Sequence, residues 1–219
     1  MTSTIFLTID GQRVEVPADA TVLEAAEAAG ITIPTLCYHP NLTSPAVCRL
    51  CVVEWEGRRT LQPACATQVA ANAVIHTRSK RVNLARRVIL EMLATTVDLS
   101  DAPELQAMLA EYDAQPQRFG EDITRREHEV IIDNSFYVRD YDKCVLCWRC
   151  VQACDVDMEH AFALGYSGRG FATSIATFFE SPLPETTCVF CGNCVGVCPT
   201  GALKDRRVFE LEMALMDAP

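Results

Sequence analysis

Two stretches of this sequence share the spacing C-x2-C-x2-C-x3-C: Cys144-Val-Leu-Cys147-Trp-Arg-Cys150-Val-Gln-Ala-Cys154 and Cys188-Val-Phe-Cys191-Gly-Asn-Cys194-Val-Gly-Val-Cys198, the second followed by Pro199. Three thiolates at this spacing can wrap around one corner of an iron–sulfur cubane. The three-residue gap carries the fourth cysteine of each run away from that corner. The spacing therefore predicts two [4Fe–4S] clusters with exchanged ligands: Cys144, Cys147, Cys150 and Cys198 on one, and Cys188, Cys191, Cys194 and Cys154 on the other.

The two runs differ in the residues between their cysteines. Gly192 and Gly196 let the second loop curl tightly, whereas Trp148 and Arg149 stand in the first loop where glycine is more comfortable. We expect the first loop to be bulkier and its cluster more shielded, which tunes the potential of a cluster. Zinc also binds C-x2-C pairs, but it needs two such pairs for each metal, so these runs suit it poorly.

The other four of the twelve cysteines, Cys37, Cys48, Cys51 and Cys65, are spaced C-x10-C-x2-C-x13-C. Plant-type ferredoxins hold a [2Fe–2S] cluster with C-x4-C-x2-C and a distant fourth cysteine, and here the first gap is longer. We expect a [2Fe–2S] cluster on these four residues. A structural zinc ion on the same set remains an alternative.

The residues before this group have the pattern of a small β-rich domain. Ile5, Leu7 and Ile9 alternate as in a half-buried strand, and Asp10-Gly11 is a hairpin turn signal. Thr21-Val-Leu-Glu24 is a capping box at the start of an alanine-rich helix. Strand, hairpin, strand and helix in this order predict a β-grasp domain.

The β-rich pattern continues beyond the cysteine loop. Residues 52–55 and 58–61 flank Gly57 as a second predicted hairpin, and residues 73–76 form a last predicted strand. We therefore assign residues 1–78 to a [2Fe–2S] ferredoxin-type domain.

Residues 79–135 are predicted to form a helical bridge and linker. Ser79 can cap a helix whose apolar positions are Val82, Ala85, Val88, Ile89, Met92 and Leu93, and a second helix is expected near Pro103. Residues 113–135 are polar and indicate a linker or partner-contacting segment. Residues 136–205 form the predicted two-cubane ferredoxin domain, and the apolar tail 206–219 is predicted to contact a partner.

Composition narrows the classes of function. The chain has 219 residues and a formal charge of −10, which three clusters would lower to about −16. This negative net charge argues against nucleic acid as a partner. It suits either docking on a basic partner or solubility alone. No apolar run could span a bilayer, and Met1-Thr-Ser-Thr-Ile has no signal-peptide pattern, so we expect no direct membrane insertion and a cytoplasmic location.

Several motifs resemble known oxidoreductase subunits. The segments Cys48-Arg-Leu-Cys51-Val-Val-Glu54 and Pro63-Ala-Cys65, with the helix Arg86-Arg-Val-Ile-Leu-Glu-Met-Leu93, resemble the N-terminal cluster domain of the large iron–sulfur subunit of respiratory complex I. The same module opens NAD-linked formate dehydrogenases and the diaphorase small subunits of hydrogenases. Residues 139–203, with Gly168-Arg-Gly170, resemble the N-terminal region of the formate dehydrogenase catalytic subunit.

The sequence departs from this family in two places. The family usually has a [4Fe–4S] cluster held by one histidine and three cysteines between the two domains, but no cysteine occurs between Cys65 and Cys144. Residues 98–128 occupy that place. In fused formate dehydrogenases a molybdopterin domain follows the ferredoxin unit, whereas this sequence ends at Pro219. The resemblance therefore implies an electron-relay chain with no catalytic residues of its own.

Taken together, the sequence predicts an α+β protein with an N-terminal β-grasp [2Fe–2S] domain, a helical bridge and a C-terminal bacterial-type 2[4Fe–4S] ferredoxin domain. The resemblance implies electron relay in an NAD(P)-linked oxidoreductase. The implied partners are a molybdenum or tungsten formate dehydrogenase or a hydrogenase catalytic subunit, and a flavin/NAD(P)-binding iron–sulfur subunit. The alternatives are a diaphorase-type hydrogenase subunit, a free diffusible ferredoxin and a zinc-stapled scaffold.

Overall fold

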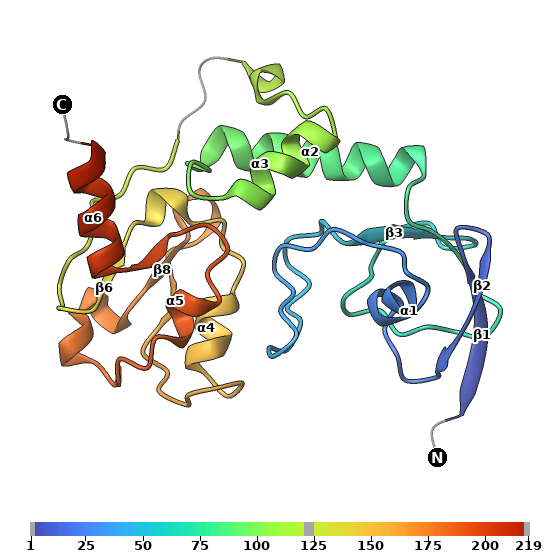
Figure 1. Cartoon of the computed structure of the whole chain (residues 1–219), viewed down its shortest axis with the longest axis horizontal. Coiled ribbons are helices and arrows are strands. Elements are labelled where there is room, and N and C mark those ends of the chain that lie inside the picture. The colour runs from blue at the N-terminus through green and yellow to red at the C-terminus, as the bar shows by residue number, and fades with distance from the viewer. Residues whose placement is uncertain (1–2, 121–124, 217–219) are drawn as a thin grey trace. The chain divides into compact units, whose positions relative to one another are not determined.

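The computed structural model describes residues 3–120 and 125–216, which form two compact units (Figure 1). The N-terminal unit comprises Met1–Tyr38, Ser44–Met92 and Met108–Pro116, and the C-terminal unit comprises His39–Thr43, Leu93–Ala107 and Gln117–Pro219. The segment predicted as a bridge and linker, residues 79–135, thus supplies residues to both units, and its residues 121–124 lie outside the described part.

The N-terminal unit begins with the predicted hairpin. Strand β1 (Thr4–Ile9) pairs antiparallel with β2 (Gln12–Pro17). The two turn residues, Asp10 and Gly11, have φ angles of 47° and 84°. Positive φ at both central positions is the geometry whose twist matches that of the flanking strands, and Asp-Gly favours it.

Three further strands complete a five-stranded mixed sheet. They are β3 (Val52–Trp55), β4 (Gln62–Pro63) and β5 (Val74–His76), and the strand order is β2-β1-β5-β3-β4. Strand β1 pairs parallel with β5, and the other pairs are antiparallel. The prediction of a return strand at residues 58–61 was wrong, because a wider loop delays it to β4, where Val53 pairs with Gln62.

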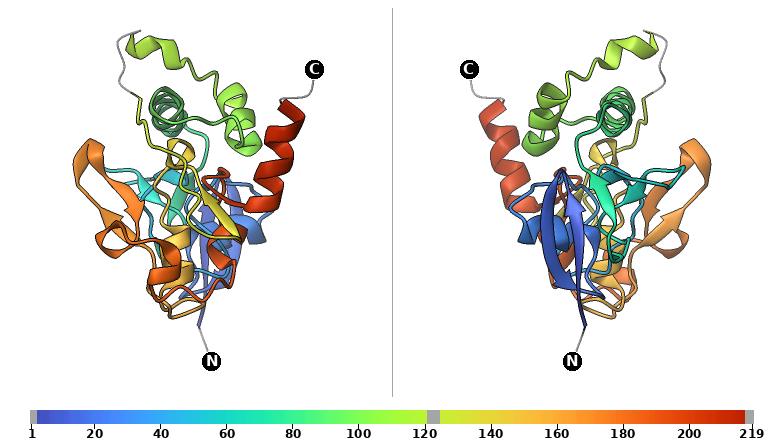
Figure 2. Two further views of the ribbon diagram at one scale, coloured as in Figure 1. Left: turned by 90° about the vertical axis from the view of Figure 1, so that its left-hand side faces the viewer. Right: turned by 90° about the vertical axis from the view of Figure 1, so that its right-hand side faces the viewer.

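Helix α1 (Val22–Ala28) covers the core of this unit (Figure 2). Its predicted capping box is present: the Glu24 N–H donates to Thr21 Oγ1 at 3.2 Å, and the Thr21 N–H donates to the Glu24 carboxylate at 2.6 Å. Gly30 follows the helix with a φ of 72°. The helix buries its apolar residues against Leu7 and Ile9 of the sheet.

The predicted helices of the middle segment are α2 (Lys80–Thr96) and α3 (Pro103–Glu111), and η1 (Pro116–Phe119) follows. Ser79 caps α2, since its Oγ accepts from the Val82 N–H at 3.3 Å. The predicted buried face of α2 was partly wrong. Met92 is exposed, whereas Arg86 and Glu91 are buried. Polar partners of these two side chains, described below, account for their burial.

The C-terminal unit contains two antiparallel strand pairs and short helices. Its strands are β6 (Tyr137–Arg139) with β9 (Leu203–Asp205), and β7 (Gly165–Ser167) with β8 (Ser174–Ala176). Its α-helices are α4 (Arg149–Cys154), α5 (Asn193–Gly196) and α6 (Arg206–Met216), and its 3-10 helices are η2 (Tyr141–Lys143), η3 (Gly170–Ala172), η4 (Phe178–Glu180) and η5 (Leu183–Glu185). Helices α4 and α5 pack on each other, and α6 contacts β6 and β9 (Figure 1).

The two cysteine runs of this unit have the same backbone conformation. Leu146 and Phe190, at matching positions, have φ angles of 53° and 55°. Trp148 precedes α4 with a φ of 74°, and Gly192 precedes α5 with a φ of 83°. Left-handed conformation costs a residue with a side chain roughly 1–2 kcal/mol, so Trp148 does stand at a position that favours glycine.

Residues 39–43 belong to the C-terminal unit although they lie between Cys37 and Cys48 in the sequence. Leu42 is buried with Ala153 and Val197. The N–H and hydroxyl of Thr43 donate to the Asp157 carboxylate at 2.7 and 2.9 Å. The long first cysteine gap therefore has a packing role that its length alone did not indicate. Within the described residues, no helix is both long and apolar enough to cross a membrane.

Candidate metal centres

All twelve cysteines are free thiols, and the structure brings them together in three groups. The first group lies in the N-terminal unit, where Cys37, Cys51 and Cys65 are buried and Cys48 is half-buried. The sulfur atoms of Cys51 and Cys65 are 3.3 Å apart. These side chains come from the segment between α1 and β3, in which Cys51 directly precedes β3, and from the loop after β4.

The thiols of the first group perturb one another. A hydrogen bond with Cys37 and burial raise the pKa of Cys48. A hydrogen bond with Cys37 lowers the pKa of Cys65, but the hydrogen bond with Cys51 and burial outweigh it and raise that pKa to about 11. All four sulfurs therefore converge, and a site of this kind exchanges thiol protons for metal.

A buried arginine binds the backbone on both sides of Cys51 in this group. Arg86 of α2 is 1% exposed. Its Nε donates to the Leu50 carbonyl at 3.0 Å, and its Nη2 donates to the Val52 carbonyl at 2.9 Å. Its Nη1 donates to the Tyr112 hydroxyl at 3.1 Å. These bonds fix the backbone on both sides of Cys51. The sequence offered only the apolar periodicity of α2, which does not distinguish a buried arginine from an exposed one.

The second and third groups line two cavities of the C-terminal unit. The lining of one cavity includes Cys144, Cys147, Cys150 and Cys198. The lining of the other includes Cys188, Cys191, Cys194 and Cys154. Each cavity thus combines three cysteines of one run with the fourth cysteine of the other run.

The pKa shifts of these thiols follow the same grouping. Burial, and then the neighbouring Cys198, raise the pKa of Cys144 to about 11 and that of Cys147 to about 12. Burial, and then Cys154, raise the pKa of Cys194 to about 12. Each fourth cysteine therefore acts electrostatically on the run to which it does not belong.

Backbone N–H groups point at the sulfurs of both runs. The Leu146 N–H donates to Cys144 Sγ at 3.4 Å, and the Phe190 N–H donates to Cys188 Sγ at the same distance. The left-handed backbone at Leu146 and Phe190 produces this matching pair. The Ala163 N–H also donates to Cys154 Sγ, at 3.2 Å. Hydrogen bonds of this kind stabilise thiolates and tune the potential of a cluster.

The two cavities differ in their cover. Trp148 lines the first cavity, and its ring packs against that of Tyr166, with centroids 4.7 Å apart. In the second run, Cys191 is exposed and the neighbouring Val189 is largely exposed. A side chain at Gly192 would place its Cβ 3.1 Å from the Tyr137 hydroxyl, so Tyr137 would have to shift to admit a larger residue there.

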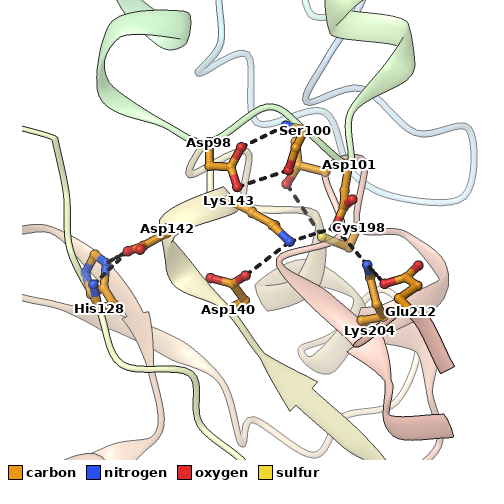
Figure 3. A network of polar contacts seen from close by, with 11 residues as sticks. Asp98, Ser100, Asp101, His128, Asp140, Asp142, Lys143, Cys198, Lys204 and Glu212 are labelled. Carbon is orange, nitrogen blue, oxygen red and sulfur yellow. Dashed lines mark hydrogen bonds and ion pairs between the residues drawn. The ribbon is translucent and has the colours of Figure 1, made fainter. Parts of the chain in front are cut away.

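Asp101 of the middle segment belongs to an ion-pair network of the C-terminal unit (Figure 3). Asp101 accepts hydrogen bonds from Lys143 and Lys204, each at 2.7 Å. Lys143 also contacts Asp140 at 3.2 Å, and Lys204 contacts Glu212 at 2.5 Å. The sequence indicates only that cysteine ligands are missing here. The structure shows that Asp101 of this segment binds two lysines of the ferredoxin-like part of the chain, and that one of them, Lys143, is next to Cys144 in sequence.

The donor sets fit iron–sulfur clusters. Each site has four thiols with no disulfide, and those of the two C-terminal groups line cavities. Within the described ranges, no group of three or more metal-binding side chains is close enough to hold one metal ion. In a cubane each thiolate binds its own iron, which needs a wider arrangement than a single ion does.

Comparison with protein families agrees with this geometry. Residues 2–80 match the 2Fe-2S iron-sulfur cluster binding domain, and residues 136–204 match the ferredoxin-like domain of NADH-quinone oxidoreductase subunit 3. The chain carries two iron–sulfur domains. We call them the [2Fe–2S] domain and the ferredoxin-like domain.

The whole arrangement of two iron–sulfur domains occurs in known oxidoreductase subunits. The chain is 38% identical to the NADP-reducing hydrogenase subunit HndD of Solidesulfovibrio fructosivorans over 97% of its length, and 34% identical to the mitochondrial NADH-ubiquinone oxidoreductase 78 kDa subunit of Candida albicans over 91%. A crystal structure of an NAD+-reducing [NiFe]-hydrogenase contains a chain that matches with a TM-score of 0.82 and 29% identity, covering 93% of this chain and 88% of that one.

The match to the curated relatives is partial on their side. The chain spans 38% of the length of the hydrogenase subunit and 28% of the length of the 78 kDa subunit. The chain therefore resembles one part of these subunits of NAD(P)-linked oxidoreductases.

Proposed function

We propose that this chain is an electron-relay subunit of a multisubunit NAD(P)-linked oxidoreductase, with one [2Fe–2S] and two [4Fe–4S] clusters. Bound clusters of these kinds accept and release single electrons without bond-making chemistry. The observation that carries the proposal is the lining of the two cavities, because each combines three cysteines of one run with the fourth of the other. Two-cluster ferredoxins use this exchange of ligands.

We assign the [2Fe–2S] cluster to Cys37, Cys48, Cys51 and Cys65, which converge in the N-terminal unit. The sheet order β2-β1-β5-β3-β4, with α1 packed on it, supports a β-grasp assignment for this domain. Burial of three of the four thiols keeps water from the cluster. Metal analysis separates this assignment from a zinc site, which would contain zinc and no iron.

The proposed partner is a catalytic subunit that oxidises a small substrate, together with a flavin/NAD(P)-binding subunit. The resemblance of residues 139–203 to formate dehydrogenase supports a molybdenum or tungsten formate dehydrogenase. A hydrogenase is the second candidate, and a specific observation favours it: a hydrogenase subunit and a hydrogenase structure both match more than nine-tenths of the chain. We place the relay in the cytoplasm.

The test is anaerobic purification from the native host, with identification of the co-purifying subunits. We expect about ten irons per chain, from one two-iron and two four-iron cores. Formate-driven or hydrogen-driven reduction of NAD(P) then distinguishes the two partners. A colourless chain that contains zinc contradicts the proposal. A stable monomer that keeps its clusters and binds neither candidate partner indicates a free ferredoxin.

A second test concerns which of the two domains faces which partner subunit. We propose that the [2Fe–2S] domain faces the flavin side. Replacing Cys51 with Ser should remove the N-terminal cluster and slow NAD(P)-linked turnover, while artificial-dye activity of the catalytic partner survives. Equal loss of both activities contradicts this orientation.

A further inference from the structure

The guanidinium of Arg86 is a buried cation whose partners are all neutral. Its three hydrogen bonds go to the carbonyls of Leu50 and Val52 and to the hydroxyl of Tyr112. In the described part of the chain, no carboxylate lies within ion-pair distance of Arg86. A buried charge without a counter-charge is strongly unfavourable, so this position calls for an anion nearby.

The geometry shows where that anion would be. Leu50 and Val52 are the neighbours of Cys51, and the guanidinium holds both of their carbonyls. Cys51 also acts electrostatically on Arg86. Four thiolates around an oxidised two-iron core carry a net charge of about −2, and this is the anion that the N-terminal group would present.

The hydrogen bonds of Arg86 hold its guanidinium in one position. The planar guanidinium presents its donors in a rigid fork, and here two of them bind carbonyls on the two sides of one cysteine. The side chain of Tyr112 holds the third donor, and it is itself buried. The charge therefore cannot move away when the charge of the cluster changes.

We propose that Arg86 is a positioning residue that shapes the Cys48–Cys51 loop and raises the midpoint potential of the N-terminal cluster. This inference rests on the proposed function, in that a [2Fe–2S] cluster binds there. One-electron reduction makes the cluster site more negative by one charge. A fixed cation nearby stabilises the reduced state more than the oxidised state, and so raises the potential.

The test is a redox titration of the full chain under anaerobic conditions, with dithionite as the electron donor and the electron paramagnetic resonance signal of the reduced [2Fe–2S] cluster as the readout. Arg86→Met removes the charge and keeps most of the volume. The expected shift is to more negative potential. For a unit charge within about 10 Å, the ratio of reduced to oxidised cluster at a fixed potential should fall about tenfold.

Two further variants separate charge from shape. Arg86→Lys keeps the charge but not the fork, so its potential should stay near that of the wild type, while an iron chelator removes iron from the cluster several-fold faster. Arg87→Met is the matched control, because Arg87 is the next residue of α2, is partly exposed and bonds only the Tyr112 carbonyl among backbone groups, at 2.9 Å. Its potential should not change.

The outcomes are distinct. A wild-type potential in Arg86→Met, or equal shifts in Arg86→Met and Arg87→Met, overturns the inference. If Arg86→Met assembles no cluster, Arg86→Lys is the deciding variant. A midpoint potential near that of the wild type supports the role of charge. A tenfold lower ratio of reduced to oxidised cluster at a fixed potential overturns it. A wild-type chain with no [2Fe–2S] signal would instead contradict the proposed function.

Discussion

Asp101 forms ion pairs with two lysines of the C-terminal unit (Figure 3). Its substitution tests how much this network contributes to the free energy of unfolding. Asp101→Asn keeps the shape of the side chain and removes its charge. In the folded chain the carboxylate accepts from Lys143 and Lys204, both at 2.7 Å. A hydrogen bond to a charged group contributes roughly 1.5–3 kcal/mol, which sets an upper range of about 3–6 kcal/mol for the two.

Two features of the structure reduce this value. The Asp101 side chain is 31% exposed, so water screens part of the interaction. Each lysine also keeps a second carboxylate, Asp140 for Lys143 and Glu212 for Lys204. We therefore expect a loss of about 2 kcal/mol, which corresponds to a melting temperature lower by about 4–8 °C for a chain of this size.

The assay is denaturant unfolding of the anaerobic full chain, followed by circular dichroism. Glu210→Gln is the control, because Glu210 pairs with Arg206 at 2.7 Å but both side chains are exposed, at 58% and 37%. Such a pair contributes less than about 0.5 kcal/mol. A loss below about 0.5 kcal/mol for Asp101→Asn, or equal losses for the two variants, would refute the reasoning.

The effect should depend on pH in a known direction. Burial raises the pKa of Asp101, but the hydrogen bonds from Lys143 and Lys204 outweigh it, and the net shift is downward. A carboxyl group with a lowered folded pKa stabilises the fold above its ordinary pKa of about 3.9, and this contribution disappears as the pH falls through the folded value. The difference between wild type and Asp101→Asn should be full at pH 7 and shrink below about pH 4.

Four other substitutions test the C-terminal unit. Cys198→Ala should remove the cluster of the first run and leave that of the second, whereas Cys154→Ala should do the reverse; loss of the cluster of its own run contradicts the exchange of ligands. Trp148→Gly opens the cavity covered with Tyr166, so water stabilises the more negative reduced cluster and a redox titration should show a higher potential; an unchanged potential contradicts the shielding role. Leu42→Ala should lower the unfolding free energy by about 2–4 kcal/mol, and a loss under about 0.5 kcal/mol would show that its packing is dispensable.

Local rules were enough to predict much of the N-terminal unit. The capping box of Thr21 and Glu24 satisfies backbone groups within one turn, so neighbours in sequence determine it. The same holds for the Asp10-Gly11 turn, whose φ angles are an intrinsic preference of these residues. The return strand after β3 was misplaced, because its position depends on pairing with a distant segment rather than on local turn chemistry.

The buried polar residues could not be predicted in this way. Arg86 and Glu91 interrupt the apolar face of α2, and periodicity assigns charged residues to the solvent side. Their burial depends on partners far along the chain: Arg86 binds carbonyls 34 and 36 residues away, and Glu91 accepts from the Gln115 N–H at 3.0 Å. A pattern within one helix contains no information about such partners.

The repeated cysteine runs show how the two kinds of information combine. The two runs share their cysteine spacing and have the same backbone conformation. In each run a left-handed residue stands at the same position, and its N–H donates to the sulfur of the first cysteine. The residues between the cysteines then make the sites unequal. Trp148 has a left-handed backbone, lines the first cavity and packs against Tyr166, whereas a side chain at Gly192 would require Tyr137 to shift. The repeat therefore sets the donor atoms of each site, and the residues that differ set how far water reaches them.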